Sequence, residues 1–224
     1  MEKGKLSVVI PTMNEEKSIG LVIEEVRKAI GTTRQLEILV VDTDSKDRTR
    51  EVASRLGTTV IDEPRRGYGR AYKTGFEKAS GEYIATLDAD MTYPASEIPS
   101  LIEKIEKENL EFITTNRFAN MAKGAMGAKH RFGNWVLSAT TRILFRVRIK
   151  DSQSGMWVFR KSCLERLNVE SDNMSFSEEL KIEAFKKLRA VEVPISYRTR
   201  VGDVKLQSWS DGFGNLKYLF KKRF

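Results

Sequence analysis

Short continuous runs of apolar residues alternate along this chain with segments in which apolar residues recur every three or four positions. Continuous runs are typical of strands buried on both faces, and the wider spacing is typical of helices with one apolar face. Their alternation predicts an α/β fold with a mostly parallel, Rossmann-like sheet flanked by helices. The predicted strands are Leu6–Thr12, Ile38–Val41, Thr58–Ile61, Tyr83–Leu87, Phe112–Thr115, Trp157–Arg160 and Val191–Tyr197.

The predicted helices fill the segments between these strands. In the first, apolar residues recur at helical spacing from Ile19 to Ile30, directly after Ser18, which is a residue type favoured at a helix N-cap. The others are Arg48–Leu56, Gly67–Ala79, a helix opened by Pro94, Arg131–Val147, Ser177–Leu188 and Ser210–Lys222. No repeat, low-complexity tract or linker interrupts the series, so we expect a single compact domain over residues 1–224.

Composition adds a preference for anionic partners. The 224 residues are 40% hydrophobic and 31% charged, which is typical of a globular protein. The 39 Lys and Arg residues exceed the 31 Asp and Glu residues and give a net charge of +8. Nucleic acid, acidic lipid and phosphorylated substrates all fit this charge, and the charge alone does not choose among them.

Cysteine and histidine are nearly absent, which removes several classes of site. Cys163 is the only cysteine and His130 the only histidine, so an internal disulfide, a Cys/His zinc site and a histidine-based triad are not expected. The apolar run at Leu6–Ile10 is too short for a signal sequence, and no run approaches the roughly 18 residues that cross a bilayer. We therefore expect a cytoplasmic protein with at most a peripheral hold on membranes.

Polar residues follow three of the predicted strands at the point where each strand ends. They are Thr12–Glu15, Asp42–Asp47 and Asp88–Thr92. In an open parallel sheet, ligands bind outside the carboxyl ends of the strands. Any one polar loop is ordinary, but three at the same edge predict a binding site.

The sharpest of these segments is Asp88-Ala89-Asp90. Residues two apart on an extended chain point to the same side, so both carboxylates can face one cation. Hard oxygen ligands suit Mg²⁺ or Mn²⁺, which often also bind substrate phosphates. The sequence therefore predicts a divalent metal that neutralises a diphosphate. The nearest approach to a glycine-rich phosphate loop, Gly67–Gly69, does not follow a strand directly and is interpreted as a turn.

These motifs, in this order and spacing, resemble the inverting glycosyltransferases of family 2 with the glycosyltransferase A fold. The resemblance is carried by Val9–Glu15, Val40–Ser45 and Leu87–Asp90. Further along, Asp151–Gly155, Glu192–Ile195 and the stretch from Arg200 to Leu206 resemble the dolichyl-phosphate mannose synthase branch. The match runs from about Leu6 to Phe220, nearly the whole chain.

The resemblance implies a role for each matching position. Residues 1–116 would form the nucleotide-sugar-binding half, residues 117–209 the acceptor half, and residues 210–224 an amphipathic terminal helix. The donor would be bound by Pro11, Glu15, Val41, Asp42, Asp88, Ala89, Asp90, Arg200 and Lys205. Asp88 and Asp90 would hold the metal, whereas Arg117 and Arg131 would receive the phosphate of the acceptor. Asp90, Arg117 and Arg131 are accordingly the expected catalytic residues.

Some positions depart from the family pattern. Met13 stands where the family usually has an aromatic residue, Thr43 replaces an aspartate, and Thr92 replaces a glutamine that often assists the metal. The base and sugar of the donor therefore stay open between GDP-mannose and a UDP-hexose. The segments Gly67–Ala71 and Thr92–Pro94 look more like those of relatives that handle UDP-sugars.

The resemblance implies the inverting transfer of a hexose to a polyprenyl or dolichyl phosphate, at a membrane. The terminal segment 210–224 mixes aromatic residues with Lys217, Lys221, Lys222 and Arg223, which suits contact with anionic lipid. The alternative for this segment is a helix packed on the core with a basic tail. A lipid phosphate is already anionic, so no general base is required.

Two other functions compete with this one. The same fold acting on a soluble or glycan acceptor would need a base, for which Glu178 or Glu179 is the candidate, although acidic residues at a helix start also stabilise its dipole. A nucleic-acid-binding module would use the basic surface and bind with a steep salt dependence. It would leave the carboxylates at three strand ends without a purpose, so we expect no nucleic-acid partner.

Overall fold

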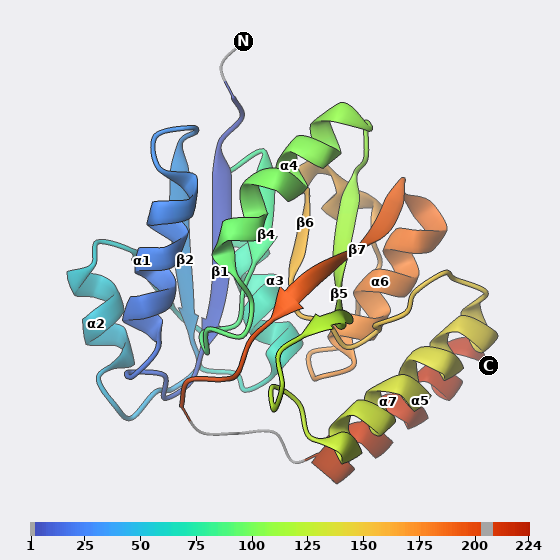
Figure 1. The fold of residues 1–224 in the computed structure, drawn as a ribbon. Helices are drawn as coiled ribbons and strands as arrows, with labels where there is room; N and C mark the ends of the chain where they lie inside the picture. The colour runs from blue at the N-terminus through green and yellow to red at the C-terminus, as the bar shows by residue number, and fades with distance from the viewer. Residues whose placement is uncertain (1–2, 203–207) are drawn as a thin grey trace.

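The strands form one sheet, and a helix lies between every two strands that are consecutive in the chain. The structure, a computed structural model, describes residues 3–202 and 208–224. In the part of the chain described, a seven-stranded sheet has the order β3-β2-β1-β4-β6-β5-β7 (Figure 1). The strands are β1 (Leu6–Thr12), β2 (Leu36–Asp42), β3 (Thr59–Asp62), β4 (Tyr83–Thr86), β5 (Phe112–Met121), β6 (Trp157–Arg160) and β7 (Ala190–Tyr197).

All pairings are parallel except those of β6, which runs antiparallel to β4 and β5. The mostly parallel sheet expected from the sequence is thus confirmed. Strand β6 starts at the carboxyl edge of the sheet, because its residue Val158 pairs with Ala85 and Arg160 with Tyr83. The segment 151–156 that leads into β6 is therefore brought to the edge where β1, β2 and β4 end.

Helices cover both faces of the sheet (Figure 1). They are α1 (Ile19–Ile30), α2 (Thr49–Arg55), α3 (Tyr68–Lys78), α4 (Ile98–Lys107), α5 (Ala128–Phe145), α6 (Phe176–Lys187) and α7 (Ser208–Arg223), with short 3₁₀ turns at Ala95–Glu97 and Lys161–Arg166. Val8 and Ile10 of β1 pack with α1 and α4, whereas Val9 between them packs with α3 and α6. Both sides of β1 are buried, which explains its continuous apolar run.

Helices α5 and α7 pack side by side outside the sheet (Figure 1). They share a third apolar cluster with α6, in which Leu137, Phe145, Ile182 and Leu219 are buried. Much of α5 nevertheless stays exposed, since its buried residues are confined to its second half. None of the described helices is both long enough and apolar enough to cross a bilayer.

Strand β5 continues well beyond the predicted Phe112–Thr115. Its second part, up to Met121, is polar and pairs with β7 across an irregularity between Asn116 and Asn120. Such a segment shows no apolar run because exposed residues form much of it. Arg117 lies in this extension and is nevertheless buried.

Candidate active site

The ends of β1 and β2 are tied together by Asp42. This carboxylate is fully buried and accepts hydrogen bonds from the Thr12 hydroxyl at 2.9 Å, and from the Ser45 amide at 3.1 Å and hydroxyl at 2.5 Å. Arg50 Nε lies 2.5 Å from Asp42 Oδ1. Asp42 is therefore a rigid part of the wall that the sequence assigns to the nucleotide pocket.

The loops after β1 and β2 are interlocked. Asn14 and Asp44 both adopt left-handed backbone conformations, with φ of 55° and 54°. The Asn14 amide oxygen accepts from the Lys46 backbone N–H at 2.7 Å, and its own N–H donates to Ser45 Oγ at 2.8 Å. The left-handed turns bring the two loops close enough for these bonds. The loop that carries Glu15 is therefore held against the loop that follows β2, whereas Val41 itself is fully buried.

Asp88 and Asp90 follow β4 at the same edge. Asp90 is 2% exposed, and its Oδ1 accepts from the Thr92 amide at 3.0 Å and hydroxyl at 2.6 Å. Asp88 keeps partial contact with solvent and accepts only a long bond, 3.4 Å, from the Tyr72 hydroxyl. Burial, and then the charge of Asp90, raise the pKa of Asp88 to about 7. A cation close to both carboxylates would therefore favour the charged form of Asp88.

Two carboxylates that lie close together at one edge of the sheet fit a divalent cation. Asp88 and Asp90 would hold it, and no third Asp, Glu, His or Cys gathers with them within the described residues. Mg²⁺ and Mn²⁺ commonly complete such sparse sites with water and substrate phosphate. The metal expected from the sequence therefore fits the residues present, with the ion shared between protein and diphosphate.

A segment after β7 closes over these carboxylates. The Val201 amide donates to the Asp90 backbone oxygen at 2.9 Å, and Arg198 N–H donates to that of Thr92 at 3.0 Å. Between them, Arg200 Nη2 lies 2.6 Å from Asp90 Oδ2, and Nη1 lies 3.9 Å from Glu15 Oε1. Arg200 thus lies beside residues that are expected to bind the donor, whereas Lys205, also expected there, is outside the described residues.

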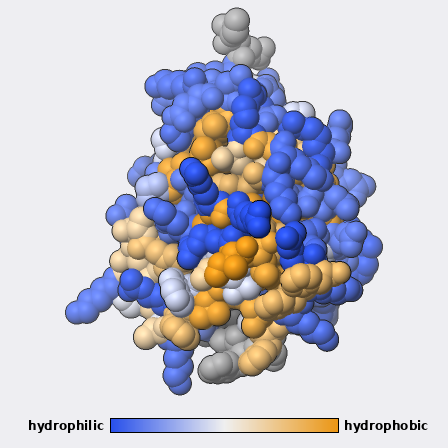
Figure 2. Space-filling model, turned by 90° about the vertical axis from the view of Figure 1, so that its right-hand side faces the viewer, coloured by the Kyte–Doolittle hydropathy of each residue, from blue (hydrophilic) through white to orange (hydrophobic). Residues whose placement is uncertain are grey.

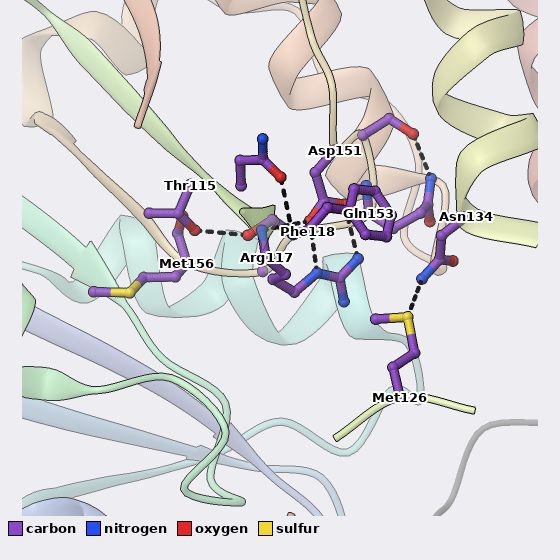
Figure 3. A network of polar contacts seen from close by, with 12 residues as sticks. Thr115, Arg117, Phe118, Met126, Asn134, Asp151, Gln153 and Met156 are labelled. Atoms are coloured by element: carbon purple, nitrogen blue, oxygen red, sulfur yellow. Dashed lines mark hydrogen bonds and ion pairs between the residues drawn. The ribbon is translucent and has the colours of Figure 1, made fainter. Parts of the chain in front are cut away.

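Arg117 is held in a buried two-point ion pair with Asp151 (Figure 3). Its Nε and Nη2 each lie 2.8 Å from a different carboxylate oxygen, and its backbone N–H donates to Asp151 at 3.0 Å. Burial disfavours the charged form of both groups, but the opposite charge of the partner outweighs this effect. The pKa of Arg117 stays well above its usual range and the pKa of Asp151 below. The charge of Arg117 also lowers the pKa of Asp88, so the two lie within electrostatic reach.

Arg131 lies elsewhere, in a pocket of about 620 Å³ between the end of β5 and α5. The pocket combines cationic with apolar and aromatic residues. It is lined by Asn116, Phe118, Ala119, Ala128, Arg131, Phe132, Trp135, Arg142 and Lys150. Arg117 belongs to the strand segment between Asn116 and Phe118 but does not line the pocket itself. The two arginines expected to share one phosphate are therefore placed at two neighbouring positions.

Tertiary structure adds residues that the sequence did not single out. Asp151 belongs to the motif Asp151–Gly155, and in the sequence only its charge, opposite to that of Arg117, pointed to this pairing. Glu178 and Glu179, the candidate bases, are fully buried at the start of α6, and Glu179 accepts from Lys222 at 2.8 Å. Lys181 on the same helix is fully buried as well.

The comparisons with known proteins agree on one family and one fold. The family model described as glycosyl transferase family 2 matches residues 7–167. The chain is 35% identical over 217 residues to the low-salt glycan biosynthesis hexosyltransferase Agl6 of Haloferax volcanii, covering 96% of this chain and 52% of that protein. It is 31% identical over 208 residues to the dolichyl-phosphate hexose transferase of the same organism, covering 92% and 89%. It therefore spans about half of the first relative and most of the second.

Solved structures share the fold at low sequence identity. Glucosyl-3-phosphoglycerate synthase from Mycobacterium tuberculosis, in complex with Mn²⁺, UDP and glucosyl-3-phosphoglycerate, superposes with a TM-score of 0.78 at 19% identity. The match covers 98% of this chain and 80% of that structure. The glycosyltransferase A fold expected from the sequence is confirmed.

Proposed function

The chain belongs to glycosyl transferase family 2 and is a glycosyltransferase, and on that premise we propose that it transfers a hexose, with inversion, from a nucleotide-diphosphate sugar to a polyprenyl phosphate. The observation that carries the acceptor is the pocket in which Arg131 stands beside Phe132 and Trp135. A cation beside aromatic rings suits a ligand with an anionic head and an apolar tail.

The donor occupies the edge formed by β1, β2 and β4. Pro11, Val41 and Asp42 face the nucleoside, and Asp88, Ala89 and Asp90 face the diphosphate. Asp88 and Asp90 would hold a divalent cation, which would neutralise charge on the departing diphosphate. Arg200, already beside Asp90, adds positive charge at the same place. The crystal structures of the mycobacterial synthase with Mn²⁺ or Mg²⁺ and UDP support this arrangement.

The acceptor enters from the side of α5. Arg131 receives its phosphate at the pocket, and Arg117, fixed by Asp151 within electrostatic reach of Asp88, holds the phosphate at the reacting end. A phosphate oxygen attacks the anomeric carbon from the face opposite the diphosphate. Catalysis comes mainly from positioning and charge stabilisation.

The burial of the two candidate bases supports a phosphate acceptor. Glu178 and Glu179 are fully buried, and Glu179 is paired with Lys222. Neither is among the residues that line the pocket of Arg131. A phosphate nucleophile is already ionised at neutral pH, so it needs no base to remove a proton. The name of the Haloferax relative that the chain covers over 89% of its length, a dolichyl-phosphate hexose transferase, points the same way.

The membrane is met by the surface that α5 and α7 present. Its exposed apolar residues, here called the α5–α7 surface, are Phe132, Trp135, Ile143, Phe213, Phe220 and Phe224. Figure 2, which views this side of the molecule, shows hydrophobic and hydrophilic residues intermixed there. Lys217, Lys221 and Arg223 are exposed on α7 and suit anionic lipid. Lys222 contributes less, because its ammonium pairs with Glu179.

A two-step experiment tests the proposal. A thermal-shift panel of GDP- and UDP-sugars, with and without Mn²⁺, identifies the donor by the stabilisation that binding produces. The donor found is then offered with dolichyl phosphate, 3-phosphoglycerate or a soluble glycan, and the glycosylated product is measured. We expect product only with dolichyl phosphate. Product with the soluble acceptors and none with the lipid phosphate would contradict the proposal.

A further inference from the structure

Lys181 is a fully buried cation that no carboxylate pairs with directly among the described residues. It lies on α6, and its exposed fraction is 0%. A lysine is almost never fully buried unless its charge is compensated. Burial lowers the pKa of Lys181 to about 7 against the opposing charge of Asp151, whereas Arg117 adds to the lowering. Retaining such a group is costly, which calls for a local reason.

The reason lies in what the ammonium contacts. Nζ of Lys181 donates to the backbone oxygens of Asp151 at 3.2 Å, Ser152 at 2.8 Å and Ser154 at 2.6 Å. The Ser177 hydroxyl, one turn earlier on α6, lies 3.2 Å from Nζ and donates to two of the same oxygens. An ammonium has three protons and no acceptor, so it matches three converging carbonyls.

The segment so gathered, residues 151–155, joins the two halves of the site. At one end the Asp151 carboxylate holds Arg117. At the other end Gly155 lies so near Asp88 that a Cβ there would come within 3.3 Å of its Oδ1. A shift of this segment would therefore move Arg117 relative to the donor carboxylates.

We propose that Lys181 is a positioning residue that fixes segment 151–155 and, through Asp151, sets the place of Arg117. It does not touch substrate. The proposal rests on the proposed function, because it assigns the consequence of that placement to the acceptor. Other charged groups near Lys181 are Glu178 on its own helix and Glu192 on β7. Glu192 accepts from the backbone N–H groups of Lys150 and Asp151, so it supports the same segment from the opposite side.

The test replaces Lys181 by Met, which has similar length but no donor. We expect the KM for dolichyl phosphate to rise by about ten-fold or more while the KM for the donor stays within about two-fold. A lysine that merely stabilised the fold would reduce the amount of active enzyme and leave both KM values unchanged. The matched control is Lys186→Met, the same change at an exposed position of α6, which should alter neither.

A second measurement does not depend on the acceptor. Amide hydrogen exchange of residues 151–155 should become faster in Lys181→Met, whereas exchange of β1 should not change. If dolichyl phosphate proves not to be the acceptor, faster exchange of this segment still supports the positioning role. Where the Met variant does not fold, Lys181→Gln retains donors and should show smaller changes of the same kind. Unchanged exchange and unchanged KM values in a folded variant would overturn the proposal.

Discussion

Arg200 reaches across the mouth of the site to Asp90, with 2.6 Å between Nη2 and Oδ2. The pair joins the segment after β7 to the loop after β4 and places a positive charge against a carboxylate that is 2% exposed. A buried carboxylate without a positive partner would destabilise the fold, so this edge of the sheet favours the binding of cations. Such an edge is suited to a metal and a diphosphate.

Replacing Asp90 by Ala should abolish transfer and remove the Mn²⁺-dependent stabilisation by the donor. One of the two carboxylates proposed to hold the metal is lost, and Arg200 loses the carboxylate with which it pairs. Both effects are measured by a transfer assay and by thermal shift. Asp172→Ala, which removes a half-exposed carboxylate paired with Lys73, is the control and should leave both unchanged. Full activity of Asp90→Ala would contradict the metal assignment.

Replacing Arg131 by Ala should weaken acceptor use without affecting stability. The side chain is exposed, and it lines the pocket rather than the donor edge. We expect the KM for dolichyl phosphate to rise by about ten-fold, with the donor KM and the melting temperature nearly unchanged. Adding Arg117→Ala should cripple the transfer altogether. Normal transfer by the double variant would show that the acceptor binds elsewhere.

Replacing Arg117 by Ala alone should also destabilise the protein. Asp151 is fully buried and would be left as an uncompensated charge, which costs about 3–5 kcal/mol. Replacing Arg117 and Asp151 together should recover part of this loss. Urea denaturation measures the free energy of unfolding for each variant. Equal loss in the single and double variants would mean that the pair does not act as a unit.

Glu178 should make stability fall as pH rises from about 4.5 to about 8. Burial raises the pKa of its carboxyl to about 8 in the folded chain, and the charge of Lys181 acts against that shift. Between the two values the folded protein keeps a proton that the unfolded chain has released, so stability is fullest below the unfolded pKa. The expected loss is at most about 1.4 kcal/mol per pH unit. Denaturation of Glu178→Gln across this range should lack that slope. An unchanged slope would assign it to another group.

The α5–α7 surface should bind anionic vesicles and release them in salt. Each exposed Lys or Arg near the lipid contributes about 1 kcal/mol, and the aromatic residues add burial. Phe132→Ser combined with Trp135→Ser should reduce co-sedimentation with phosphatidylserine vesicles. Leu21→Ser, on α1 and also exposed, is the matched control and should not. Equal binding by all three proteins would exclude this surface as the contact.

The pattern of the sequence was sufficient for the elements and for the edge that carries the donor site. The segments Leu6–Thr12 and Trp157–Arg160 were predicted as strands and are strands with those bounds. Asp42 and Asp88 could be placed at strand ends because each directly follows a run of apolar residues, which is typical of a buried strand. Local periodicity needs no knowledge of distant segments. The roles given to these residues remain predictions, and the fold is confirmed.

Only the tertiary structure decided which charges meet and which helices stay exposed. The direction of β6, the pairing of Arg117 with Asp151, and the burial of Lys181 all depend on segments distant in sequence. The terminal helix was expected to offer four cations to lipid, yet packing of α7 against α6 turns Lys222 inward to Glu179. The sequence alone does not distinguish a solvated charged side chain from a buried one. Its partner is fixed by the free energy of desolvation and pairing, which exists only once the chain has folded.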